Sequence, residues 1–385
     1  MLPKNLPFLL LLFGFPAFVM AQNKPANYET KIIAHFKQQS FPDSGLSKEN
    51  LYRDPMGRKL KVTISNKYIE FDTAQIILKN PYFSEKYEEA EEEKTVVKNF
   101  PKSYSVIYDN RLVSLFENGS FACFKLENFD PDQELANKLN TKKFRYHWII
   151  NGQLAGLAGK TIYVWNNNDW IKLKSKFPLK NRPILFEDDF YIVYSDCSGE
   201  WGGTAYFFQK STGKTFFTES TCTNTVAKDE NGYTLLANLG HGNGFVRIKA
   251  IPDPTKLTLA ALDKIGQPVN GEALGYRDKS KGFEIKLDQW GFQVFSTFKY
   301  HGSTLYIVNL AELTFIAEIN NERIELVNPL FFDGLYSHEP VTTTYAEYTL
   351  VNLDFYGIGL DREVALLLIK GNKIIKIDWN EYHKH

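Results

Sequence analysis

Apolar and polar residues alternate in short runs from about residue 101 to the end of the chain, and turn residues separate the runs. The segment VIYDNRLVSLFENGSFACFKL predicts strands that are joined at Asp109-Asn110 and at Asn118-Gly119. Asn and Gly tolerate the positive φ angles that tight hairpin turns need. The same alternation recurs in WIINGQLAGLAGKTIYVWNNNDWIKL and in REVALLLIKGNKIIKIDW. This period of two predicts an all-β protein made of consecutive hairpins.

Helical periodicity is limited to short insertions. Ser84 precedes a run of glutamates, and we expect a short acidic helix near 84–95 with a solvated charged face. The alternative is that these glutamates bind a cation or a partner. Further helical turns are expected within 130–143 and near Pro254, and residues 22–100 are less regular than the rest.

Many short strands fit a sandwich, a barrel or a propeller, and the length of the chain separates these folds. A sandwich is commonly about 100 residues, so several copies with linkers would be needed. No Pro/Ser/Gly-rich linker follows residue 101. At roughly 50 to 60 residues a blade, residues 22–385 supply six or seven four-stranded blades. We therefore predict a single β-propeller domain over 22–385, with short helical insertions.

The first residues, MLPKNLPFLLLLFGFPAFVMAQ, have the pattern of a secretory signal peptide. Lys4 gives a basic start, an apolar run follows, and small residues precede an expected cleavage between Ala21 and Gln22. The apolar run is shorter than the roughly 20 residues that span a bilayer. No later segment approaches a membrane span, so we expect an exported protein, periplasmic or extracellular, without a transmembrane segment.

Charge and chemistry exclude several classes of function. The chain has 45 basic and 45 acidic residues and no basic stripe, which argues against a nucleic-acid partner. Its seven histidines are scattered, and no Cys/His cluster has metal-ligand spacing. No Gly-x-Ser-x-Gly nucleophile motif is present. We expect neither a metal nor a cofactor.

Three cysteines remain in the predicted mature chain, which is an odd number for an exported protein. Cys123 alternates with aromatic residues in SFACFKL and is expected to be a buried free thiol. By elimination, Cys197 and Cys222 form the candidate disulfide. A hairpin centred on 211–213 would place Gly202 opposite Cys222, and the glycines of 198–203 would let the loop bring Cys197 within reach.

The stretch SDCSGEWGGTAYFF, residues 195–208, contains the first candidate site. Asp196, Glu200 and Trp201 lie in one loop, and Glu219 lies on the returning strand. As a pocket, these residues offer carboxylates for sugar hydroxyls, for a cation or for acid–base catalysis, together with a tryptophan face for stacking. The alternative is structural: the carboxylates accept backbone N–H bonds in a tight turn, and the tryptophan covers the disulfide.

A second candidate is His241, which glycines flank in ANLGHGNGF. The imidazole could be presented at a face of the propeller, where loops carry function. The alternative is a turn with a solvent-facing ring. Convergence of His241 with Asp196 and Glu200 on one face would support a site.

Two segments resemble known propeller repeats. QKSTGKTFFT, residues 209–218, is similar to the outer-strand hairpin of quinoprotein-type or kelch-type propellers, and Trp201-Gly202-Gly203 resembles the double glycine of a kelch repeat. The match covers one blade. The whole chain resembles poorly characterised exported β-propeller proteins, and this resemblance implies the architecture but no activity.

We predict an exported scaffold that binds an unknown protein or glycan ligand. The lack of a catalytic signature favours a binding protein over an enzyme, and the assignment rests partly on architectural analogy. The alternative is a carbohydrate-active enzyme, a glycoside hydrolase or lyase, with Asp196, Glu200 and His241 at the propeller face. A third possibility is an accessory part of a surface assembly without a ligand of its own.

Overall fold

A computed structural model describes most of the chain. The described residues are 20–21, 27–39, 45–53, 60–82, 84–87, 94–97, 101–174, 182–240, 244–261, 282–320, 323–330, 335, 337, 339–356 and 362–379.

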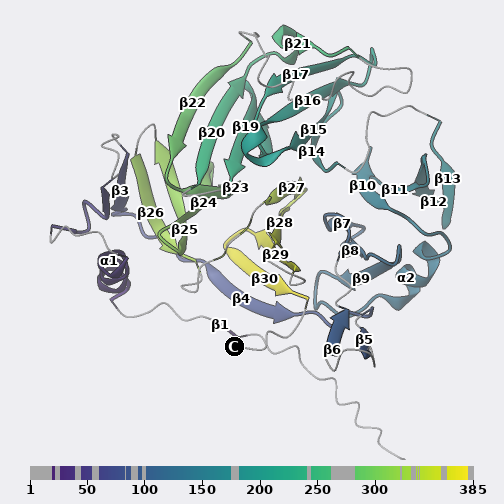
Figure 1. Cartoon of the computed structure of the whole chain (residues 1–385), viewed down its shortest axis with the longest axis horizontal. Coiled ribbons are helices and arrows are strands. Elements are labelled where there is room, and N and C mark those ends of the chain that lie inside the picture. Colours follow the sequence, from purple (N-terminus) through teal and green to yellow (C-terminus); the bar gives the residue numbers. More distant parts are fainter. Residues whose placement is uncertain are drawn as a thin grey trace, which may run out of the picture.

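Six antiparallel sheets stand in a ring as the blades of a β-propeller (Figure 1). This confirms the predicted all-β propeller and sets the blade number at six. The first three blades follow one another along the chain. Blade 1 contains β7 (Val106–Tyr108), β8 (Arg111–Leu115) and β9 (Phe121–Lys125); blade 2 contains β10 (Tyr146–Ile150), β11 (Gln153–Ala158), β12 (Thr161–Asn166) and β13 (Asp169–Lys172); blade 3 contains β14 (Ile184–Glu187), β15 (Tyr191–Cys197), β16 (Gly203–Gln209), β17 (Thr215–Glu219) and β21 (Thr258–Leu259).

The last three blades complete the ring. Blade 4 contains β18 (Thr223–Asp229), β19 (Gly232–Leu239), β20 (Phe245–Ile251) and β22 (Glu284–Trp290); blade 5 contains β23 (Gln293–Tyr300), β24 (Ser303–Leu310), β25 (Leu313–Asn320) and β26 (Arg323–Pro329); blade 6 contains β27 (Val341–Tyr345), β28 (Tyr348–Tyr356), β29 (Arg362–Lys370) and β30 (Lys373–Asp378).

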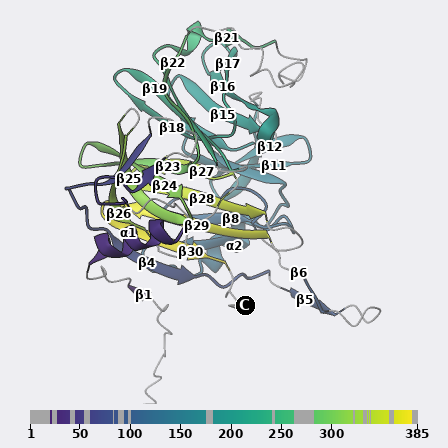
Figure 2. The ribbon, with the colours of Figure 1, turned by 60° about the vertical axis from the view of Figure 1, so that its left-hand side comes forward.

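N-terminal strands are added to the outer edges of the last two blades. In blade 5, β3 (Lys61–Ile64) pairs in parallel with β26 and carries β2 (Tyr52–Arg53). In blade 6, β4 (Asp72–Ile77) pairs in parallel with β30 and carries β1 (Met20–Ala21). Figures 1 and 2 show β4 beside β30 and α1 (Tyr28–Gln38) next to blade 5. This arrangement ties the start of the chain to its end.

Helices are few, as expected. A short α2 (Gln133–Leu139) lies within the predicted range 130–143, and 3₁₀ turns lie at Pro254–Lys256 and Gly199–Trp201. The acidic helix predicted near 84–95 is wrong, because β5 (Ser84–Tyr87) and β6 (Lys94–Val97) form an antiparallel hairpin. The β-branched residues of Lys-Thr-Val-Val favour a strand over a helix. Helix α1 was not predicted; it buries Ile32 and Phe36 against blade 5.

Apolar clusters between neighbouring blades hold the ring together. One cluster joins blades 2 and 3 through residues such as Trp148, Tyr194 and Tyr206, and another joins blade 6 to blade 1. Polar side chains on second strands then satisfy the backbone of the next blade. Asn352 of β28 accepts the Ser105 N–H at 2.7 Å and donates to its carbonyl at 3.2 Å, which closes the ring between blades 6 and 1.

The predicted disulfide is confirmed, and it joins two blades rather than the strands of one hairpin. Cys197 ends β15 of blade 3, Cys222 precedes β18 of blade 4, and their Cα atoms lie 4.4 Å apart. The expected hairpin register is wrong by one residue, because Thr204 pairs with Glu219, which places Gly203 next to Ser220 and Gly202 opposite Thr221 rather than Cys222. Cys123 is a buried free cysteine, as predicted. No helix among the described residues is long and apolar enough to be a membrane span.

Neighbouring strands of a blade run in opposite directions, so the connections between strands lie on two opposite faces of the propeller. The disulfide face carries Cys197–Cys222 and the connections β15–β16, β17–β18, β19–β20 and β22–β23. The turn face carries the tight hairpin turns at 109–110, 151–152, 167–168, 230–231 and 371–372.

Candidate functional site

One continuous row of residues crosses blades 3 and 4 at the disulfide face. Cys197 pairs with Gly203 in blade 3, and in blade 4 Leu239 pairs with Phe245, which pairs with Trp290. The disulfide bridges the two halves of the row, and both cysteines pack against Leu239 and Phe245. The end of blade 3 is therefore fixed covalently to the end of blade 4.

The disulfide anchors the turn that presents Trp201. Residues Gly199–Trp201 form a single 3₁₀ turn, which the Ser198 N–H closes by donating to the Gly202 carbonyl at 2.8 Å. Gly199 and Gly202 have φ angles of 58° and 90°, which favour glycine. Trp201 is 78% exposed, so most of its side chain faces solvent rather than covering the disulfide as the structural alternative expected.

A second aromatic side chain is exposed on the same face. The Trp290 ring lies 4.6 Å from the Phe245 ring and is 52% exposed. The Arg247 guanidinium stacks on Phe245 at 5.1 Å. Stacking of this kind fixes the orientation of the aromatic group. Blades 3 and 4 thus hold two exposed tryptophans, Trp201 and Trp290, at the two ends of the row of residues that the disulfide bridges.

Asp196 is committed to a cluster between blades 2 and 3. Its carboxylate accepts the Thr204 N–H at 2.9 Å and the Tyr206 hydroxyl at 2.8 Å, and it pairs with Arg182 at 3.1 Å. The Arg182 guanidinium also lies 5.3 Å over the Tyr206 ring. Burial and the adjacent Asp196 carboxylate raise the pKa of Tyr206, so the phenol stays protonated and donates. Each of these contacts holds Asp196 in place between the two blades.

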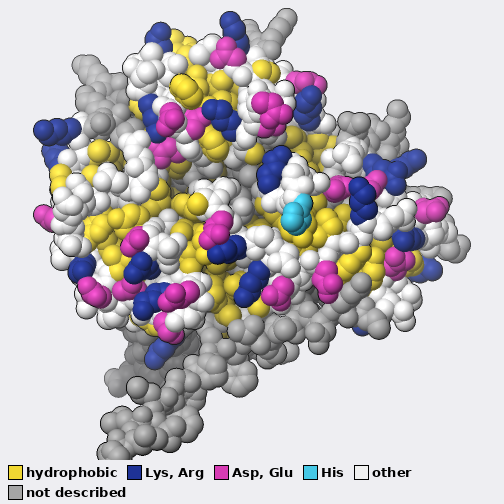
Figure 3. All heavy atoms as spheres, turned by 180° about the vertical axis from the view of Figure 1, so that it is seen from behind, with side chains coloured by type: hydrophobic (Ala, Val, Ile, Leu, Met, Phe, Trp, Pro, Cys, Tyr) yellow, Lys and Arg dark blue, Asp and Glu magenta, His cyan; other side chains and the backbone are white. Residues whose placement is uncertain are grey.

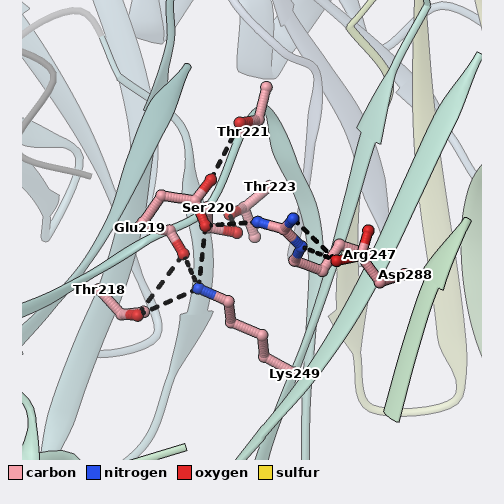
Figure 4. Close-up of polar contacts among 8 residues, drawn as sticks. All are labelled: Thr218, Glu219, Ser220, Thr221, Thr223, Arg247, Lys249 and Asp288. Carbon is pink, nitrogen blue, oxygen red and sulfur yellow. Dashed lines mark hydrogen bonds and ion pairs between the residues drawn. The ribbon is translucent and has the colours of Figure 1, made fainter. Parts of the chain in front are cut away.

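Glu219 forms the centre of an ion-pair network between blades 3 and 4 (Figure 4). Its carboxylate pairs with Arg247 at 2.7 Å and with Lys249 at 3.1 Å, both on β20. Arg247 reaches on to Asp288 at 2.9 Å, and the Lys249 ammonium also donates to the Glu219 carbonyl. The Lys249 side chain is only 3% exposed, so its charge depends on Glu219.

The other candidates are arranged differently. Glu200 is an exposed residue of the 3₁₀ turn, beside Trp201. His241 lies outside the described residues, so its convergence with Asp196 and Glu200 stays a prediction. Among the described residues no group of His, Cys, Asp and Glu could hold a metal ion. Asp196 and Glu219 both face cations, an arrangement that suits inter-blade ties better than proton transfer.

Figure 3 shows the charge pattern of one face. Among the described residues there, basic and acidic side chains lie side by side between apolar areas, and neither sign dominates. This agrees with the balanced composition of the chain.

Several residues of this region had no signal in the sequence. Arg182, Arg247 and Lys249 were missed because their partners lie on other strands, as far as 41 residues away. The alternation of charges in FVRIKAI did mark one face of that strand as polar, and a search for a carboxylate partner could have found Glu219.

No family model matches the chain, and no curated protein matches it. Many solved structures show some similarity, among them the following three. BamB from Moraxella catarrhalis is 10% identical over 76% of this chain and 74% of that chain, with a TM-score of 0.35. The N-terminal domain of Nup159 is 8% identical over 84% and 89%, with a TM-score of 0.36. Kluyveromyces lactis Hsv2 is 10% identical over 71% and 98%, with a TM-score of 0.32. At these values the similarity assigns no role to any residue of this chain.

Proposed function

We propose that the protein is an exported binding scaffold whose partner docks on the disulfide face of blades 3 and 4. Export is supported by the signal-peptide pattern and by a disulfide, since such bonds persist in oxidising compartments. The resemblance of residues 209–218 to kelch-type and quinoprotein-type repeats fits a scaffold of this kind.

The exposure of Trp201 carries this proposal. A tryptophan that is 78% exposed leaves a large apolar ring with a polar N–H in water, the kind of side chain that a partner covers at an interface. Tryptophan is also the residue type most enriched among binding hot spots. Trp290 gives a second anchor in a neighbouring blade, and the disulfide keeps the turn ordered before binding, which lowers the entropic cost of association.

The partner is a protein or glycan surface that presents an apolar or stacking group to the two tryptophans. An enzyme is less well supported, because Asp196 and Glu219 are held by Arg182, Arg247 and Lys249. A glycoside hydrolase needs two carboxyl groups that are free to exchange protons or attack the sugar.

Binding assays on three variants test the proposal. Trp201→Ala and Trp290→Ala are compared with Phe190→Ala, a matched control whose side chain is 62% exposed on the turn face. The mature protein is screened against glycan and peptidoglycan arrays and against proteins of its own compartment. Loss of a hot-spot tryptophan is expected to weaken binding about 30-fold, and Phe190→Ala is expected to leave it unchanged. Binding that survives both tryptophan changes contradicts the proposal.

A further inference from the structure

A cleft of about 460 Å³ opens between blades 1 and 2 on the turn face. Its volume lies within the roughly 300–1,000 Å³ that small-molecule sites occupy. The cleft is lined by the 109–110 turn of blade 1, by α2, and by the 166–168 turn of blade 2. It shares no residue with the disulfide face, and its two walls differ sharply in chemistry.

The wall from blade 1 is charged, and its three carboxylates outnumber its two cations by one. Arg111 pairs with Asp109 and with Asp132, each at 3.0 Å, and Lys138 pairs with Glu134 at 2.7 Å. The Asp132 carboxylate also accepts the Leu135 N–H and thereby caps α2, and this lowers the pKa of Asp132. These groups form a polar surface in which the buried Asp132 is held by Arg111 and by the Leu135 N–H.

The wall from blade 2 is uncharged and consists of side-chain amides. Gln153, Asn166, Asn167 and Asn168 line it. In the part of the chain that the structure describes, none of their side-chain amides has a hydrogen-bond partner within the protein. Asn167 and Asn168 have φ angles of 50° and 63°, so a tight turn holds them in place at the cleft mouth. Each amide offers an acceptor oxygen and two N–H donors.

The lining disfavours other kinds of ligand. An anion would meet three carboxylates, and Arg111 and Lys138 are already paired. A metal ion would find no suitable group of His, Cys, Asp and Glu among the described residues. An apolar ligand would find little surface, since Trp165 is only 5% exposed.

We propose that this cleft binds a neutral saccharide, with the amides of Gln153 and Asn166–Asn168 on one side and the carboxylates of blade 1 on the other. Sugar hydroxyls both donate and accept, so they match amides that are uncommitted in both roles. The carboxylates of Asp109, Asp132 and Glu134 supply further acceptors for hydroxyl donors. This site is separate from the docking surface at Trp201, so the scaffold would hold a glycan on its turn face and a partner on its disulfide face.

Ligand-observed saturation-transfer NMR and calorimetry with maltotriose, cellotriose and N,N′,N″-triacetylchitotriose test this site on the mature protein. The double variant Gln153→Ala/Asn166→Ala is expected to weaken binding of the preferred trisaccharide about tenfold. The matched control, Asn231→Ala/Asn372→Ala, removes two exposed amides elsewhere on the turn face and is expected to have no effect. Asn166→Asp keeps the shape of the side chain and serves if the double variant folds poorly; it is expected to weaken binding as well.

Four results would overturn the site. The first is no binding of any of the three trisaccharides, and the second is binding that the amide variants leave unchanged. The third is tighter binding of the anionic trimer of galacturonic acid. The fourth is loss of sugar binding in Trp201→Ala, which would move the sugar to the disulfide face. Failure of the docking proposal would instead appear as partner binding that tolerates Trp201→Ala and Trp290→Ala, so the two failures are distinguishable.

Discussion

Reduction of the Cys197–Cys222 bond is expected to destabilise the fold and loosen the docking surface together. The bond closes a loop with a sequence separation of 25. On the chain-entropy model, a closed loop of this length is worth about 3.5 kcal/mol at 25 °C. The expected loss is of this size because the Glu219 network and an apolar cluster hold blades 3 and 4 together after reduction, so the bond acts mainly by constraining the unfolded chain.

Guanidinium denaturation of the mature protein with and without a reductant measures this loss. The midpoint should fall and the slope should rise slightly, because the unfolded chain without the cross-link is more expanded and exposes more surface. The variant Cys197→Ala/Cys222→Ala should not respond to reductant, and Cys123→Ala should respond as the wild type does, because Cys123 is a free thiol. Reduction should also weaken partner binding through the Trp201 turn. A loss below about 1 kcal/mol would refute the entropic reasoning.

Three further predictions concern the contacts between blades. Burial lowers the pKa of His147 from 6.5 to about 4. The contribution of the neutral imidazole to the free energy of unfolding is therefore complete above pH 6.5 and is lost as the pH falls toward 4. Urea denaturation across this range should show a decrease of about 3 kcal/mol in the free energy of unfolding, and His147→Gln should remove this pH dependence. Asn352→Ala leaves the buried Ser105 N–H and carbonyl without their partner, and the free energy of unfolding should fall by about 2 to 4 kcal/mol, whereas Asn372→Ala should be neutral. Glu219→Gln leaves the Lys249 charge buried and should lower the free energy of unfolding by about 3 kcal/mol in the same assay. The double variant Glu219→Gln/Lys249→Met should restore most of this stability. Additive losses in the double variant would contradict the ion-pair account.

The alternation of residues was enough to predict the fold class, because half-buried strands impose a period of two wherever they occur. Turns such as Asp109-Asn110 were also predictable, since both residues adopt positive φ. The pairing of Cys197 with Cys222 followed from elimination. These features depend on short stretches of chain.

Long-range pairings could not be predicted in this way. β3 and β4 align in parallel with strands that begin at Arg323 and Lys373, and nothing in their short sequences specifies such distant partners.

One repeat was present in the sequence and was missed: the tripeptides 237–239, 308–310 and 351–353 place an asparagine on the second strand of blades 4, 5 and 6. Asn238 bonds to the backbone of the next blade, and Asn309 and Asn352 bond to backbone groups of the segments that precede the next blades.

The candidate site was predicted in part. Asp196, Glu200, Trp201 and Glu219 do belong to blade 3, as the hairpin pattern indicated. Whether a carboxylate is free or ion-paired depends on side chains from other strands, so the commitment of Asp196 to Arg182 had no signal in the sequence. The exposure of Trp201 likewise depends on the direction of a single turn.

Photo-crosslinking from two positions tests the central claim most directly. The photo-crosslinker p-benzoylphenylalanine is placed at position 201 in one sample and at position 190 in the other, and the exported protein is irradiated in its own compartment. The docking account predicts a discrete crosslinked partner from position 201 and none from position 190. Equal crosslinking from both positions, or crosslinking from position 190 alone, would contradict it.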